Sequence, residues 1–146
     1  MDVTYYSHTQ EIKGKLPTAA AIAGGALLLV LPGGFLARLL WLGVAAGTAA
    51  TFRSLTVNIE SDAVRFQFGT GMIKKSIPLS KIKSATVIRT TPLQGWGIHW
   101  IGKGWLYNIY GLDAVDMEMA DGGHVFLGTD QPQELAAVIN QHCSKE

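Results

Sequence analysis

A long apolar stretch near the N-terminus is the feature that most limits what this chain can fold into. Residues 17–52 contain a single charged side chain, Arg38, and the other 22 charged residues lie outside that stretch. The whole chain is 48% hydrophobic and only 16% charged, whereas an average globular domain carries about 25% charged residues. Intrinsic disorder is therefore excluded, because it needs low hydrophobicity and high net charge.

A break in the middle divides this stretch into two arms. Pro32-Gly33-Gly34 interrupts any helical pattern, and each arm could form a helix of roughly 15 to 18 residues, about 22 to 27 Å long. Both would be shorter than the ~30 Å hydrocarbon core of a bilayer. We expect an N-terminal transmembrane helical hairpin over residues 17–52. The alternatives are a hairpin buried in a globular core and a cleaved signal peptide, and the second apolar arm argues against the latter.

The charges that flank the apolar stretch predict its orientation. Lys13 and Lys15 precede it and Arg53 follows it, so the positive-inside tendency places both termini in the cytoplasm. Arg38 either extends to the outer headgroups or marks a polar site inside a helix bundle. Residues 1–16 are interpreted as a cytoplasmic tail or a short edge strand.

From residue 53 onward, apolar and polar residues alternate with a period of two, which is typical of half-buried strands. Leu55, Val57 and Ile59 begin the series, and later segments are separated by turn residues such as Gly69-Thr70-Gly71. Regularly spaced short strands indicate an antiparallel barrel or sandwich. The fold class is therefore expected to be mainly β, with about seven strands in the globular part.

The chain is expected to end in one helix that closes the barrel. Asp130 suits the N-cap and Gln133 the capping-box position. The residues on its apolar stripe are Leu135, Val138, Ile139 and His142. Three regions follow from this reading: a tail over 1–16, a membrane hairpin over 17–52, and a β-barrel domain with its C-terminal helix over 53–146.

A loop rich in glycine and tryptophan, residues 91–104, is the strongest candidate for an interaction site. Loops of this length in compact domains are often functional, and tryptophan suits both protein interfaces and lipid headgroups. The loop either docks on a membrane, on the hairpin or on a partner or ligand, or it covers the second opening of the barrel. The candidate ligand-binding or membrane-docking residues are Trp96, His99, Trp100, Trp105 and Asn108.

Charge is distributed unevenly within the last 94 residues. Residues 53–103 contain eight basic and two acidic side chains, and residues 104–146 contain one basic and seven acidic side chains. Basic residues beside a membrane attract anionic lipid, although solvated strand faces carry lysines equally well. The residues predicted to form an anionic-lipid face are Lys74, Lys75, Lys81, Lys83 and Arg89.

Patterns typical of enzymes and metal sites are weak. Asp116 and Glu118 share one strand face, which is an ordinary place for carboxylates. The four histidines do not follow a metal-site spacing, and the single cysteine excludes a disulfide framework. A net charge of +1 argues against nucleic-acid binding. We therefore expect no catalytic residue, metal or cofactor.

The segment GWGIHWIGKGWLYNIYGLDAVDMEMADGGHVFLGTDQPQELAAVI, residues 95–139, resembles bacterial pleckstrin-homology-like (PH-like) domains in their small membrane-anchored form. The resemblance implies a partly open seven-stranded barrel closed by a C-terminal helix, on the cytoplasmic side of a bacterial inner membrane. Lipid-phosphate-binding relatives have basic residues between the first two strands of the barrel. Here that turn is Glu60-Ser61-Asp62, so phosphoinositide binding of that kind is not expected.

Together these observations predict a membrane-anchored PH-like binding or scaffolding module rather than an enzyme. Its expected partners are the lipid bilayer and either a second copy of the chain or another membrane protein. The alternative is an accessory or regulatory subunit of a membrane transporter or envelope complex, in which Arg38 and the hairpin would be the working part.

Overall fold

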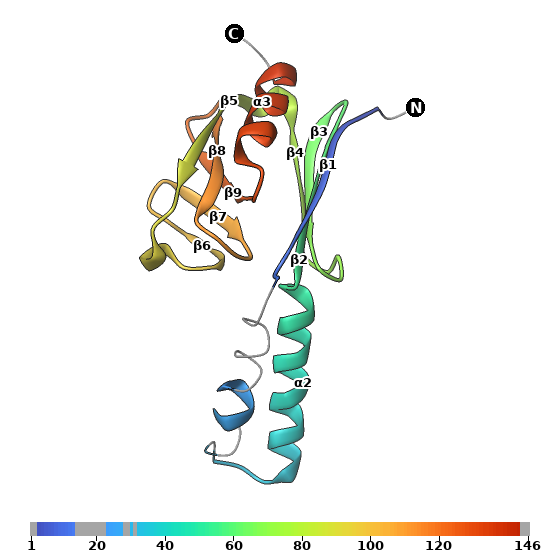
Figure 1. Cartoon of the computed structure of the whole chain (residues 1–146), viewed down its shortest axis with the longest axis vertical. Helices are drawn as coiled ribbons and strands as arrows, with labels where there is room; N and C mark the ends of the chain where they lie inside the picture. The colour runs from blue at the N-terminus through green and yellow to red at the C-terminus, as the bar shows by residue number, and fades with distance from the viewer. Residues whose placement is uncertain (1–2, 14–22, 28–29, 31, 144–146) are drawn as a thin grey trace.

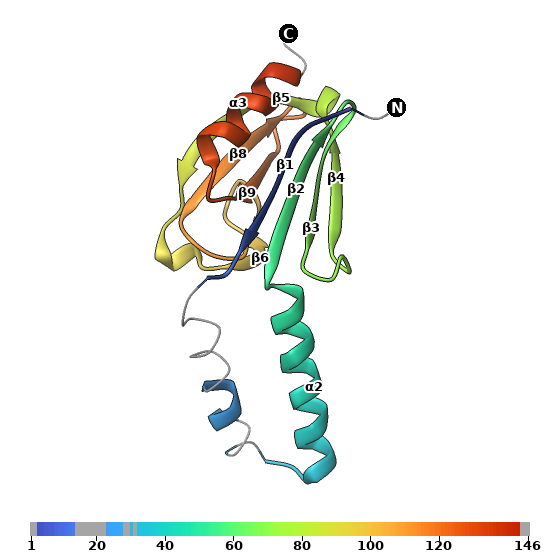
Figure 2. The ribbon, with the colours of Figure 1, turned by 45° about the vertical axis from the view of Figure 1, so that its right-hand side comes forward.

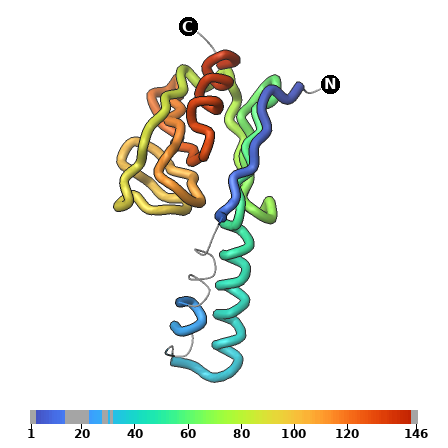
Figure 3. The backbone as a smooth tube through the Cα atoms, in the orientation of Figure 1, coloured from blue at the N-terminus to red at the C-terminus, as the bar shows by residue number. Residues whose placement is uncertain are grey.

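The computed structural model describes residues 3–13, 23–27, 30 and 32–143, and it is mainly β (Figure 1). Two sheets pack against each other to form a β domain, and one long helix extends away from its lower end (Figures 1 and 3). The strands in the described residues are β1 (Thr4–Glu11), β2 (Ser54–Glu60), β3 (Ala63–Phe68), β4 (Lys74–Pro78), β5 (Ile82–Arg89), β6 (Gly97–Trp100), β7 (Gly104–Asn108), β8 (Asp113–Met119) and β9 (His124–Gly128). The helices are α2 (Phe35–Thr51), α3 (Pro132–His142) and the short 3-10 turns η1 (Leu79–Lys81) and η2 (Pro92–Gln94).

Each sheet has a simple order. The first sheet runs β1-β2-β3-β4, and every pair in it is antiparallel. The second runs β5-β8-β9-β7-β6, and its β7 and β9 are parallel while its other pairs are antiparallel. The core lies between the sheets, because the alternation that begins at Leu55 directs Leu55, Val57 and Ile59 inward, where all three are buried. Helix α3 adds Leu135 and Ile139 to the same core.

Strand β1 shows that the N-terminal residues belong to the β domain. It pairs with β2 along nearly its whole length, from Thr4 opposite Glu60 to Glu11 opposite Ser54. The Ile12 amide also donates to the Arg53 carbonyl oxygen at 3.1 Å. The apolar stretch is therefore a long excursion between two strands that lie side by side. Of the two interpretations of the N-terminal tail, the edge strand is the one observed.

The expected transmembrane hairpin over residues 17–52 is wrong, and with it the expectation of a membrane-spanning protein. Helix α2 has 17 residues, about 26 Å at 1.5 Å per residue. Within the described part of the chain, no helix is both long and apolar enough to cross a membrane. For the first arm, the prediction over residues 17–22, 28–29 and 31 lies outside the described residues; residues 23–27 and 30 are helical.

The seven-stranded antiparallel barrel is corrected to nine strands in two sheets, counted over the described residues. The two additional strands are β1 and β6. The alternation of β1 is mostly polar, and β6 is formed by the glycine-rich segment that was expected to be a loop. The closing helix occurs where it was expected, but its N-cap is Gln131 without a side-chain capping bond. Asp130 instead pairs with His8 at 2.6 Å.

Candidate functional site

Helix α2 is an apolar helix that the β domain leaves uncovered. All 17 of its residues are described and none is buried, and the helix points away from both sheets (Figures 1 and 2). Arg38 is exposed on it. Its exposed large apolar side chains are Phe35, Leu36, Leu39, Leu40, Trp41, Leu42 and Val44. A helix that is apolar on all sides normally lies inside a protein core or in lipid.

The base of α2 is held firmly against the first sheet. The Phe52 ring packs edge-on against Phe68, with ring centroids 5.3 Å apart. The Gly69 amide donates to the Ser54 carbonyl oxygen at 2.8 Å. Gly69 has a φ of +33°, and a Cβ at this position would collide with the carbonyl oxygens of Ala50 and Thr51. Glycine is therefore required both by the backbone conformation and by the close approach of α2.

The tryptophans of the predicted docking loop form two separate aromatic pairs instead of one cluster. Trp96 lies 5.7 Å from Tyr110 between ring centroids. Trp100 and Trp105 lie opposite each other on β6 and β7, 6.1 Å apart and nearly perpendicular. All four rings are substantially exposed, so both pairs are available for contact with another molecule.

The two polar residues predicted in this loop differ in role. Asn108 is fully buried, donates from Nδ2 to the Gly111 carbonyl oxygen at 3.0 Å, and accepts from the Tyr110 amide at 3.2 Å. Its side chain therefore holds the turn after β7. His99 is half-buried, and its Nε2 is enclosed without a hydrogen-bond partner among the described residues.

A hollow of about 460 Å³ lies beside the Trp96–Tyr110 pair. Its lining residues are all uncharged: Pro92, Gly95, Trp96, Tyr110, Gly111 and Leu112. A surface of this composition favours an apolar occupant over an ionic one.

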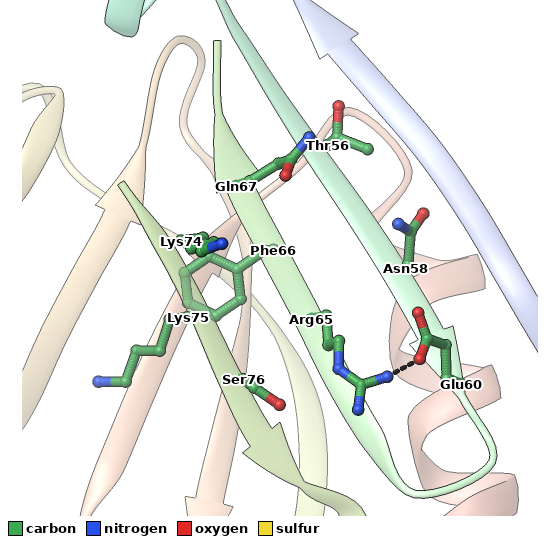
Figure 4. A pocket seen from close by; sticks show the side chains of 9 residues that line it. All are labelled: Thr56, Asn58, Glu60, Arg65, Phe66, Gln67, Lys74, Lys75 and Ser76. Atoms are coloured by element: carbon green, nitrogen blue, oxygen red, sulfur yellow. Dashed lines mark ion pairs between the residues drawn. The ribbon is translucent and has the colours of Figure 1, made fainter. Parts of the chain in front are cut away.

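A second hollow, of about 560 Å³, lies over the first sheet (Figure 4). Arg65 extends along this surface to pair with Glu60 and also donates to Asp62 at 3.1 Å. Its charge is thus balanced locally, and the hollow offers neutral hydrogen-bonding groups together with the two lysines at the start of β4. The lining residues are Thr56, Asn58, Glu60, Arg65, Phe66, Gln67, Lys74, Lys75 and Ser76.

The structure does not bring the five predicted lipid-binding cations onto one face. Lys74 and Lys75 begin β4, whereas Lys81 and Lys83 lie near the start of β5 and Arg89 at its end. Eight residues of strand separate these ends by about 23 Å.

Three of these five cations have partners within the β domain. Lys75 donates to the Tyr107 hydroxyl at 2.9 Å. Arg89 lies 3.9 Å from Asp113. Lys83 donates to Glu118 at 3.1 Å, and this bond together with the charge of Lys83 lowers the pKa of Glu118.

The sequence did not reveal a polar seam that β1 forms with the turn after β7 and with the segment before α3. The Tyr6 hydroxyl donates to Gln131 at 3.0 Å, and the Gln10 amide donates to the Tyr110 carbonyl oxygen at 3.1 Å. Burial, followed by the negative charges of Glu134 and Asp130, raises the pKa of Tyr6 to about 12. The inward positions of β1 carry polar or aromatic side chains, so a search for apolar alternation could not detect this strand.

Among the other ionisable groups of the described residues, Asp116 and His124 form a close pair. The Asp116 carboxylate accepts a hydrogen bond from His124 Nδ1 at 2.8 Å. Within the described residues, no group of three or more His, Cys, Asp or Glu side chains is placed to hold a metal ion. Cys143 is a buried free thiol at the end of α3.

Comparison of the chain with protein-family models and with curated proteins found no match. The resemblance to PH-like domains therefore remains a prediction from the sequence. The exposed helix α2 and the surfaces around it are the features on which a functional proposal rests.

Proposed function

We propose that this protein is a binding or scaffolding module that helix α2 holds at a lipid surface by inserting into the apolar part of the bilayer. The observation that carries the proposal is that α2 has 17 residues with a single charge and no buried side chain. The proposal requires insertion of α2 and not a membrane span. The resemblance to PH-like domains favours the cytoplasmic face of a bacterial inner membrane.

The exposed apolar side chains of α2 make contact of this helix with water energetically costly. Burying one large apolar side chain contributes about 1.5–3 kcal/mol, so seven of them represent roughly 10–20 kcal/mol. The net stability of a typical domain is only about 5–15 kcal/mol. Leaving such a helix in water would therefore cost as much as a domain gains by folding.

The distribution of apolar residues around α2 favours lipid over a protein groove. A groove covers one stripe of a helix and leaves the opposite side polar. Leu39, Leu40 and Leu42 are consecutive or nearly so in sequence and thus point in different directions around the helix, yet all are exposed. Lipid surrounds a helix on every side and matches this pattern.

Attachment to a surface explains how a small β domain would act without catalysis. A tethered domain is confined to a thin layer, which raises its effective concentration toward any partner on the same surface. The polar hollow on the first sheet then provides hydrogen-bonding groups for such a partner. A weak contact would be sufficient for scaffolding.

The test is flotation of the full-length chain with phosphatidylcholine vesicles. We expect the wild-type protein and the L36A/L40A variant to float, and the L36E/L40E variant to remain in the aqueous fraction. Because neither side chain is buried, both variants should keep the circular dichroism of the wild type. Wild-type protein that stays off vesicles, or glutamate variants that float equally well, would contradict the proposal.

A further inference from the structure

Two loops distant in sequence lie at the same end of the β domain as α2. The β3–β4 turn, residues 69–73, and the segment around η2, residues 90–96, both lie at the lower end of the domain, from which α2 extends (Figures 1 and 2). They belong to different sheets, one on each side of the core. This end of the molecule, formed by the two loops and the base of α2, is called the α2 end below.

Both loops present large apolar side chains to the surroundings. Leu93 in η2 is 99% exposed and Met72 in the β3–β4 turn is 83% exposed. Trp96 follows η2, is 52% exposed, and borders the uncharged hollow. A single exposed apolar residue needs no explanation, but three of them on two loops, at the end of the domain from which an exposed apolar helix extends, call for one.

The charges at this end are mainly basic. The exposed cations are Lys13 after β1, Arg53 before β2, Lys74 at the start of β4 and Arg89 at the end of β5. The acidic groups that face them are Glu11 at the end of β1 and Asp113, which lies 3.9 Å from Arg89. Basic residues therefore outnumber acidic ones around the apolar loops.

We propose that the α2 end of the β domain docks on an anionic lipid surface, with Met72, Leu93 and Trp96 entering the headgroup layer beside α2. This inference rests on the proposed function, in which α2 inserts into lipid. Tryptophan favours the headgroup layer because its ring is apolar and its N–H is polar. Each basic residue near an anionic surface strengthens binding about fivefold.

Contact through α2 and two loops would fix the orientation of the domain. A helix alone leaves a tethered domain free to swing, but the base of α2 is already locked by Gly69 and Phe52. Contacts on both sides of that base would hold the domain upright on the lipid. The polar hollow of the first sheet would then face sideways, parallel to the surface and open to partners.

The experiment measures quenching of tryptophan emission by brominated lipid in full-length variants that each keep one tryptophan. The variant W41F/W100F/W105F keeps Trp96, W96F/W100F/W105F keeps Trp41 in α2, and W41F/W96F/W100F keeps Trp105. Trp105 is the matched control, because it is similarly exposed but lies at the other end of the β6–β7 hairpin. The vesicles are phosphatidylcholine alone or mixed with phosphatidylglycerol.

We expect loss of emission from Trp41 and Trp96 and no loss from Trp105. We also expect Trp96 to lose more emission on the vesicles with phosphatidylglycerol, and adding R53Q/K74Q/R89Q to remove that difference while leaving Trp41 unchanged. If Trp41 is quenched and Trp96 is not, the docking inference is wrong and the proposed function stands. If neither is quenched, both are wrong. Equal quenching of Trp96 on the two lipids would overturn the anionic part.

Discussion

Helices α2 and α3 differ in burial, and the difference is the opposite of what their apolar content alone would predict. Helix α2 is almost entirely apolar and has no buried residue, whereas α3 is mixed in composition and buries Pro132, Leu135, Ala136 and Ile139. The β domain thus covers the less apolar helix. What differs is the pattern, since α3 carries its apolar residues on one stripe and α2 carries them all round. Periodicity, not total hydrophobicity, determines which helix joins this core.

Helix α3 also makes more extensive contact with the β domain than helix α2 does. Helix α3 packs on β5 and β8 and touches β1, so that it joins the two sheets. Helix α2 meets the domain at its base, where Phe52 and Gly69 hold it. Substitutions in α3 should therefore affect folding, while substitutions along α2 should affect attachment to lipid and leave folding nearly unchanged.

The largest expected effect comes from a matched pair of leucine truncations. L135A removes a fully buried side chain and should lower the free energy of unfolding by about 2–5 kcal/mol. L40A removes a side chain that is 70% exposed and should change it by less than about 0.5 kcal/mol. Urea denaturation of both variants in the same detergent measures the difference. Equal losses would show that α2 is part of the folding unit.

Much of this contrast could be predicted from the sequence. The alternation that begins at Leu55 and the stripe that contains Leu135 and Ile139 identify strands and a helix whose apolar side faces the core. The apolar excursion is equally visible, and α2 has the length expected for its second arm. The predicted membrane span was wrong because a helix of this length falls short of the ~30 Å hydrocarbon core of a bilayer. Strand β1 could be anticipated only as one of two alternatives, a tail or an edge strand, because its pairing with β2 joins residues across that whole excursion.

The candidate site was less predictable than the fold. The exposure of Trp96 and the position of η2 at the same end of the domain as α2 depend on how the two sheets meet, which no local pattern encodes. Asn108 illustrates the reverse case: its residue type suggested a ligand contact, but the turn after β7 uses both ends of its amide. Lys83 and Arg89 lie within one strand of eight residues, yet near its opposite ends.

A pair of glycine substitutions tests whether the base of α2 is rigid. G69A forces a side chain into a left-handed backbone and against two carbonyl oxygens of α2, and should cost about 1–3 kcal/mol. G71A shares the positive φ, at +79°, but its nearest neighbour would be 3.6 Å away. G69A should therefore be clearly the more destabilising in urea denaturation. Similar costs would mean that α2 does not press on the turn.

Removing the polar contact between α3 and β5 should lower the free energy of unfolding by a smaller amount. Asn140 donates to the Ala85 carbonyl oxygen at 2.7 Å and accepts from the Ala85 amide at 2.8 Å, so it substitutes for a neighbouring strand at this edge. N140A leaves both backbone groups without their partner and should cost about 1–2 kcal/mol. Q141A, at an exposed position on the same helix, is the control. Hydrogen exchange should show faster exchange of the Ala85 amide only in N140A.

The smallest expected effect concerns pH and the contact of β1 with the segment before α3. Burial raises the pKa of Tyr6 from 10.0 to about 12, so the folded protein keeps the phenol neutral after the unfolded chain has ionised. The stabilisation is complete below pH 10 and is lost as the pH rises from 10 to 12. Y6F lacks this ionisation and, without the hydrogen bond to Gln131, should lose about 1 kcal/mol at neutral pH. In urea denaturation, the difference in the free energy of unfolding between wild type and Y6F should therefore shrink above pH 10. A difference that stays constant would show that Tyr6 ionises as freely in the folded chain as in the unfolded one.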